Sequence, residues 1–195
     1  MFNLEISEHL SPFAIYLVTF ISLSLNGVSN LPSSQIVYLT LGYLINKISF
    51  NFYIAMLLGA IGNTLGNFVL YEIVKSRSDF LNSKISKFLS LDKEATLNYV
   101  DKFRHKWWGW LILGKMTPTI KVFVPIICGL SLVSRGKALI IFFIGSLAWA
   151  IAVTYLGYYF GKDANLLEFY FIVTAIYIIV GALSYLKIHI QKDKK

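Results

Sequence analysis

The sequence predicts an all-α membrane protein: an inverted repeat of a re-entrant hairpin plus a transmembrane helix, with an additional C-terminal transmembrane helix. Three observations predict this class. Of the 195 residues, 56% are hydrophobic and 14% are charged, whereas soluble domains carry about 25% charged residues. Some apolar stretches reach the roughly 20 residues that a helix needs to cross a bilayer. Other apolar stretches are interrupted by glycine, proline and polar residues.

Three uninterrupted apolar stretches are long enough to cross about 30 Å of hydrocarbon. They lie at residues 50–74, 138–160 and 166–186, and we expect each to be a transmembrane helix. The chain length suits a single membrane domain that covers residues 1–195.

Two broken apolar regions, at residues 10–46 and 107–134, are expected to be re-entrant hairpins. A polar run at 26–34 interrupts the first, and residues 114–121 interrupt the second. Irregular backbone at membrane depth must be buried in protein or line a wet cavity. The alternative is a pair of short helices outside the membrane for each region. The residues expected to shape the two regions are Pro32 and Gly42 in the first, and Gly114, Pro118, Pro125 and Gly129 in the second.

Basic residues predict the orientation, because the cytoplasmic loops of membrane proteins are rich in Lys and Arg. Such residues gather in the loop at 75–106, at Arg135 and Lys137, and in the C-terminal tail. The loop mixes them with apolar residues, which is typical of an amphipathic helix on an anionic membrane surface. We therefore expect a multi-pass protein of the cell (inner or plasma) membrane with a cytoplasmic C-terminus.

This orientation gives the two units of hairpin plus helix opposite directions. Transporters built from inverted repeats place their binding site where the broken helices meet, near the bilayer midplane. A binding site is therefore expected between the break at Pro32 and the break at Pro118.

Lys115 and Lys121 lie in the second break, on either side of Thr117, Pro118 and Thr119. A lysine at the bilayer centre costs about 2.5–3.5 kcal/mol on insertion scales, so it usually faces a cavity or a partner. Two ammonium groups and the freed backbone amides would form an anion site, in which lysine binds phosphate as a point charge. The alternative is that both lysines snorkel to the headgroups and bind nothing.

Polar and small residues elsewhere are further candidates for the site. Gln35 is the polar counterpart in the first region, where it hydrogen-bonds a headgroup or caps a short helix. In the first transmembrane helix, Gly62 and Gly66 let another helix approach closely. Asn63 and Asn67 lie one turn apart on a shared face, where they join helices or line a cavity.

Glu72 is the single carboxylate in the same helix, close to its basic end. It either forms a salt bridge with the basic loop or serves as a cavity residue for proton coupling. Both interpretations are open at the level of the sequence.

No enzyme, metal or cofactor signature is present. The single cysteine, Cys128, and the scattered histidines lack the spacing of a zinc site. Two Ser-x-x-Lys spacings, at 90–93 and 134–137, have no accompanying motif and are attributed to chance. The net charge of +8 is explained by cytoplasmic loops rather than by nucleic-acid binding. We expect a protein that is not an enzyme and that binds neither metal, cofactor nor nucleic acid.

A series of short motifs occurs in order from about Leu31 to Gly161. The motifs are Pro-Ser-Ser-Gln at 32–35 with Gly42-Tyr43, Gly62 and Gly66 with Tyr71, Gly-Lys-Met-Thr-Pro-Thr-Ile-Lys at 114–121, Pro125 with Gly-Leu-Ser at 129–131, Gly-Ser-Leu-Ala-Trp at 145–149, and Gly-Tyr-Tyr-Phe-Gly at 157–161. In this order they resemble the DedA family of bacterial membrane proteins, which share the SNARE-associated or VTT domain.

The resemblance implies two facing re-entrant hairpins and the transport or scrambling of lipids with phosphate headgroups, such as undecaprenyl phosphate or phosphatidylethanolamine. It places Lys115 and Lys121 at cations that are usually arginine in the family. Gln35 stands where the family usually has Glu, and Asn67 where it often has Asp. The absence of both acids argues against coupling to the proton-motive force. Lysine keeps the positive charge of arginine but cannot bind a phosphate through two parallel hydrogen bonds.

The expected function is therefore a flippase-type or scramblase-type lipid transporter, with a non-transporting scaffold for envelope maintenance as the alternative. The expected partners are a phospholipid or polyprenyl-phosphate headgroup and the anionic membrane surface. A homo-oligomer is compatible with the sequence.

Overall fold

The computed structural model describes residues 11–45, 47–76, 94, 109–115 and 121–161, without the side chain of Trp110. All elements in this part of the chain are helices: α1 (Pro12–Ser29), α2 (Ser34–Leu44), α3 (Phe52–Ser76), α6 (Gly109–Lys115), α7 (Phe123–Leu130) and α8 (Arg135–Gly161). The predicted helix at 166–186 and nearly all of the loop at 75–106 lie outside the described residues.

Within the described residues, three helices are long and apolar enough to cross a membrane, namely α1, α3 and α8. The helices α3 and α8 correspond to the stretches predicted at 50–74 and 138–160, and their existence confirms a helical, multi-pass membrane protein. Both run through long apolar segments without proline, so no residue removes a backbone donor from their interiors.

The helix α1 differs from the sequence-based prediction. The polar run at 26–34 was expected to break the chain, but α1 continues through Asn26 to Ser29 and the break is confined to 30–33. Ser11 caps the start of α1 by accepting from the Ala14 amide. Asn30 ends it in the left-handed conformation, at φ 61°, which asparagine tolerates better than most residues.

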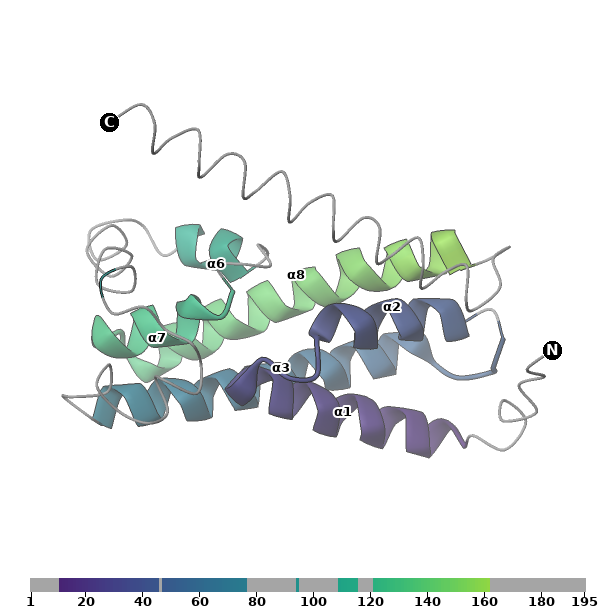
Figure 1. Cartoon of the computed structure of the whole chain (residues 1–195), viewed down its shortest axis with the longest axis horizontal. Coiled ribbons are helices and arrows are strands. Elements are labelled where there is room, and N and C mark those ends of the chain that lie inside the picture. Colours follow the sequence, from purple (N-terminus) through teal and green to yellow (C-terminus); the bar gives the residue numbers. More distant parts are fainter. Residues whose placement is uncertain (1–10, 46, 77–93, 95–108, 116–120, 162–195) are drawn as a thin grey trace, which may run out of the picture.

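The two broken regions interlock with the two long helices (Figure 1). The first arm of the first region, α1, packs along α3, and its second arm, α2, packs along α8. In the second region the first arm, α6, packs along α8, and the second arm, α7, packs along α3. The helices α3 and α8 also contact each other and run in opposite directions (Figure 1). Each long helix therefore packs mainly against one arm from each broken region.

Glycines permit the closest of these contacts. A Cβ atom at Gly66 of α3 would collide with the Ser24 carbonyl oxygen of α1, and one at Gly27 would meet the α3 backbone. A Cβ atom at Gly42 of α2 would likewise collide with the Thr154 carbonyl oxygen of α8. Backbone contact of this kind is how helices associate in membranes without a hydrophobic driving force between them.

A polar layer separates two apolar clusters along α3 and α8. One cluster includes Met56 of α3 and Ala150 of α8. The other includes Tyr71 of α3 and Phe142 of α8. Between them lie buried polar and charged side chains: Asn26, Ser34, Gln35, Asn63, Asn67, Lys115, Lys121 and Ser146. The polar layer is therefore enclosed by protein on both sides along the long helices.

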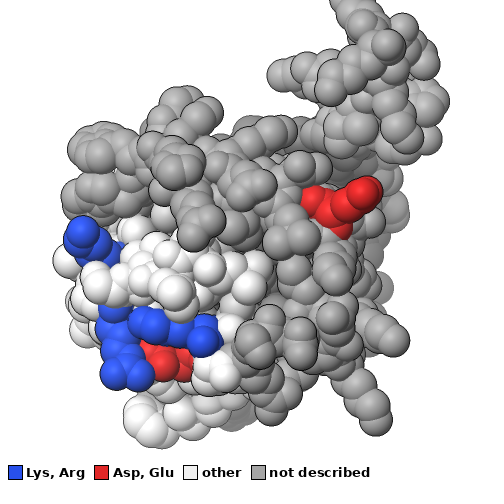
Figure 2. Space-filling view, turned by 90° about the vertical axis from the view of Figure 1, so that its left-hand side faces the viewer, with Lys and Arg blue, Asp and Glu red and all other residues white. Residues whose placement is uncertain are grey.

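Charged side chains gather at the end of the molecule where α3 ends and α8 begins (Figure 2). There Arg135 donates two hydrogen bonds to Glu72, from Nε to Oε1 at 2.7 Å and from a terminal nitrogen to Oε2 at 3.1 Å. Lys75 donates to the Tyr71 hydroxyl, which in turn donates to the Val133 carbonyl oxygen at 2.5 Å. These bonds join the end of α3 to the segment that leads into α8.

Candidate functional site

The break after α1 brings Ser34 and Gln35 to the centre of the molecule. Asn26 donates to the carbonyl oxygen of Pro32 at 2.7 Å, and Ser29 donates to that of Leu31 at 3.1 Å. These two bonds satisfy carbonyl groups that the break would otherwise leave unpaired. The start of α2 is thereby held beside α1, with both Ser34 and Gln35 buried.

Lys115 and Lys121 point into the protein from the other side. Lys115 is the last residue of α6 and is 4% exposed, and Lys121 precedes α7 and is 7% exposed. Gly145 of α8 makes room for the first of them, since a Cβ atom there would lie 2.5 Å from Lys115 Cγ. Snorkelling lysines would expose their ammonium groups, and these two do not. Thr117, Pro118 and Thr119, between them, lie outside the described residues.

Each ammonium group hydrogen-bonds neutral oxygen atoms. Lys115 Nζ donates to Asn67 Oδ1 at 2.7 Å. Lys121 Nζ donates to Ser34 Oγ at 2.5 Å and lies 3.4 Å from Gln35 Oε1. The two lysines thus connect the second broken region to α3 and to the start of α2, across 48 and 87 residues of sequence respectively.

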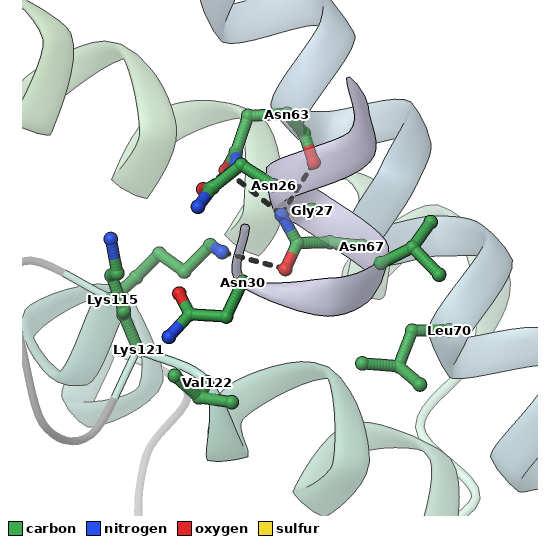
Figure 3. A pocket seen from close by; sticks show the side chains of 10 residues that line it. Asn26, Gly27, Asn30, Asn63, Asn67, Leu70, Lys115, Lys121 and Val122 are labelled. Atoms are coloured by element: carbon green, nitrogen blue, oxygen red, sulfur yellow. Dashed lines mark hydrogen bonds between the residues drawn. The ribbon is translucent and has the colours of Figure 1, made fainter. Parts of the chain in front are cut away.

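A chain of buried amides continues from Lys115 through α3 to α1 (Figure 3). Asn67 donates to Asn63 Oδ1 at 2.9 Å, and Asn63 donates to Asn26 Oδ1 at 2.9 Å. Ser146 of α8 also donates to Asn63 Oδ1, at 2.8 Å. The sequence left two roles open for Asn63 and Asn67, and in the structure they have both: they join helices, and they line the space beside the lysines.

No carboxylate accompanies the lysines among the described residues. The acidic residues in this part of the chain are Glu72 and Glu94, and Glu72 is paired with Arg135. Glu72 was a candidate for the cavity and for a bridge to the 75–106 loop. It lines neither pocket described below and bonds Arg135 at the start of α8, and nearly all of the loop lies outside the described residues. Because the described acceptors of Lys115 and Lys121 are neutral, no side chain in the described part of the chain compensates the two positive charges, which favours binding of an anion.

Two small pockets lie against the lysine pair. We call the first the asparagine pocket; its lining is Asn26, Gly27, Val28, Asn30, Asn63, Asn67, Leu70, Lys115, Lys121 and Val122 (Figure 3). We call the second the tryptophan pocket; its lining is Ser34, Tyr38, Asn63, Lys115, Lys121, Ser146 and Trp149. The space in each is about 10 Å³, enough for about one water molecule. A phosphate group is larger, so its binding requires the walls to move apart.

Several residues of this site were not predicted from the sequence, although most of them lie in segments whose pattern was already unusual. Asn26 and Asn30 belong to the polar run at 26–34, and Ser34 belongs to Pro-Ser-Ser-Gln. Ser146 and Trp149 belong to the motif at 145–149. Tyr38 had no signal of its own, but it lies one helical turn after Gln35 on α2.

Three apolar helices of spanning length and a buried basic site between two broken regions define a multi-pass membrane protein. The chain matches the family model of the VTT domain over residues 31–159 and belongs to that family, whose domain defines the DedA and SNARE-associated proteins. The matched region begins in the break before α2 and ends within α8. Among curated proteins and solved structures, none matches the chain.

Proposed function

We propose that this protein moves lipids with phosphate headgroups between membrane leaflets, as a flippase-type or scramblase-type transporter. The observation that carries the proposal is the burial of Lys115 and Lys121 where the two broken regions meet, with neutral acceptors as their described partners. A headgroup phosphate supplies the negative charge that this site lacks. No enzymatic step is part of the proposal.

The charge of the site bears on the choice of lipid. A phosphate monoester carries about −1.5 to −2 charges at pH 7, which matches two lysines more closely than a singly charged diester does. Undecaprenyl phosphate is therefore the first lipid to test, and phosphatidylethanolamine the second. Lysine binds as a point charge without fixed fork geometry, so the site tolerates several headgroup orientations during passage.

The packing of the arms supports the predicted inverted repeat. In both broken regions the first arm packs on the long helix that follows it, and the second arm packs on the long helix of the other unit. Gly42 and Gly129 mark this correspondence: each lies on a second arm, against α8 and α3 respectively.

The lengths of the short helices support re-entrant arms. At 1.5 Å per residue, α2 and α7 are about 16 and 12 Å long, well short of the hydrocarbon thickness. The helix α1, at about 27 Å, is the arm that comes closest to crossing. We propose that the tips of both regions meet at the polar layer, inside the membrane.

The orientation proposed here is that of the sequence analysis, with a cytoplasmic C-terminus in the cell membrane. The basic residues Lys75, Arg135 and Lys137 lie at the end where α3 ends and α8 begins. The helix α8 runs away from that end (Figure 1). The positive-inside rule assigns this end to the cytoplasm. The variants Lys137→Cys and Lys47→Cys, each in a Cys128→Ala background, test the assignment. Each single cysteine is labelled with a reagent that does not cross the membrane.

The lysine pair is tested in reconstituted liposomes that contain headgroup-labelled lipid. The double variant Lys115→Met, Lys121→Met keeps the side-chain volume and removes both charges. We expect it to lose translocation of phosphate lipids while eluting as a folded protein. The matched control is Lys75→Met with Lys137→Met, which removes two charges outside the polar layer. Unchanged translocation by the first double variant would overturn the proposal.

One observation favours the alternative, a non-transporting scaffold for envelope maintenance. Both pockets are small in the described conformation, with room for about one water molecule each. A scaffold predicts that the lysines hold the two regions together and that translocation is absent from the wild type as well. The scaffold hypothesis would be supported by a protein partner that co-purifies with the wild type and is lost when the lysines are replaced.

A further inference from the structure

Two residues that line the tryptophan pocket carry a buried donor with no hydrogen-bond partner among the described residues: Tyr38 with its hydroxyl and Trp149 with its indole nitrogen. Tyr38 comes from α2 and is 1% exposed, and Trp149 comes from α8. Buried polar groups are nearly always paired, so two unpaired donors in one pocket call for an explanation. Neither group is used by the lysine–asparagine network described above.

We propose that the tryptophan pocket binds a phosphate oxyanion, with the Tyr38 hydroxyl and the Trp149 N–H as its neutral donors and Lys121 as its cation. This inference rests on the proposed function and deepens it, because it names the pocket and the uncharged groups that hold the phosphate.

The chemistry of the lining favours an anion over other ligands. The indole nitrogen of tryptophan can donate but cannot accept, so its partner must be an acceptor. Lys121 Nζ lies 5.7 Å from the centre of the Trp149 ring, which puts a positive charge over the ring that carries this donor. A cationic ligand would be repelled, whereas a phosphate oxygen accepts from all three groups. Phosphate oxygens accept strong hydrogen bonds from charged donors.

The fold holds the two neutral donors on a rigid pair of helices. Backbone contacts at Gly42 and Gly157 lock α2 against α8 on the side of the pocket away from the lysines. Lys121 precedes α7, which packs on α3 instead. The pocket therefore enlarges by displacement of Lys121 from Ser34, while Tyr38 and Trp149 keep their separation.

The test measures phosphate binding by calorimetry and by the shift in thermal midpoint of the purified full-length protein in detergent. The probes are inorganic phosphate, dihexanoyl phosphatidic acid, and dihexanoylglycerol as the phosphate-free control. The main variant is Tyr38→Phe, which removes one hydroxyl and keeps the ring. Trp149→Phe is the second variant. The matched control is Thr154→Val, which removes another unpaired buried hydroxyl of α8 that does not line this pocket.

We expect Tyr38→Phe to weaken binding of a phosphate probe about tenfold, the usual effect of one hydrogen bond to a charged group. Its midpoint without ligand should equal or exceed that of the wild type, since the hydroxyl has no partner to lose. Thr154→Val should bind as the wild type does. Binding of phosphatidic acid alone identifies a lipid headgroup site, and equal binding of inorganic phosphate identifies a site for the free ion; both support the pocket.

Wild-type affinity in Tyr38→Phe and Trp149→Phe would overturn the inference and leave a pocket that holds water. Absence of binding of both phosphate probes to the wild type would overturn it too. If the lysine double variant loses translocation while these two variants bind normally, this inference fails and the proposed function stands. If the lysine variant translocates normally while Tyr38→Phe loses phosphate binding, the proposed function fails and the pocket stands.

Discussion

Lys121 Nζ lies 2.5 Å from Ser34 Oγ and 3.4 Å from Gln35 Oε1, so the two breaks in the chain meet through their side chains. Gln35 and Lys121 each follow the proline of their own break by three residues, Pro32 and Pro118 respectively. In the inverted repeat that we propose, these two positions would be equivalent. The candidate site would then be a contact between corresponding positions of two units, with a charged side chain in one unit and an amide in the other.

Gln35→Glu should lower phosphate-lipid translocation in a pH-dependent manner. An ionised carboxylate beside Lys121 cancels one of the two positive charges, and we expect about a tenfold loss at pH 7, as for one charged hydrogen bond. As the pH falls toward the usual range of Glu, near 4.3, protonation removes the added charge and translocation should recover. Liposome assays between pH 3.5 and 7.5 measure this, with the wild type over the same range as the control. A loss that does not recover at low pH would contradict the charge argument.

Asn67→Leu should destabilise the protein, because Lys115 loses the oxygen it donates to and remains buried. We expect the free energy of unfolding to fall by about 1.5–3 kcal/mol, the range for hydrogen bonds to charged groups. Lys115→Met in the same chain should recover much of this loss, since the unpaired charge is then absent. Denaturant titration of the four members of this double-mutant cycle measures the coupling. Strict additivity of the two single effects would show that Lys115 and Asn67 do not interact.

Gly66→Ala should weaken the packing of α1 on α3. A Cβ atom at this position meets the Ser24 carbonyl oxygen and Gly27, both backbone groups that cannot rotate away. We expect a loss of about 1–3 kcal/mol, the usual cost of overpacking. Gly136→Ala, in the first turn of α8, is the matched control, because nothing lies within 4 Å of a Cβ atom there. Thermal unfolding in detergent should separate the two variants clearly, and equal midpoints would count against the packing described here.

Glu72→Gln should leave lipid translocation unchanged at every pH. The carboxylate bonds Arg135 at the end of α3 and lines neither pocket beside the lysines. The liposome assay with and without an imposed pH gradient measures this, and Arg135→Gln should behave in the same way. A gradient-dependent rate that disappears in Glu72→Gln would restore this residue as a proton carrier.

Local patterns in the sequence were enough to predict several features. The helices α3 and α8 follow from uninterrupted apolar length, and the break at Pro32 follows from a residue that lacks a backbone donor. The cost of placing lysine at membrane depth pointed to Lys115 and Lys121 before any contact was known. Each of these inferences depends on one continuous stretch of the sequence.

The tertiary structure alone decided which side chains meet. The helix α1 passes through Asn26, against the sequence-based prediction, where that side chain bonds Asn63, 37 residues away. Glu72 bonds Arg135 across 63 residues, which no local pattern favoured over the basic loop. Tyr38 and Trp149 share a pocket because α2 packs on α8 through glycine contacts. Hydropathy specifies how deep a residue lies, but the partner at that depth is set by helix packing between distant parts of the chain.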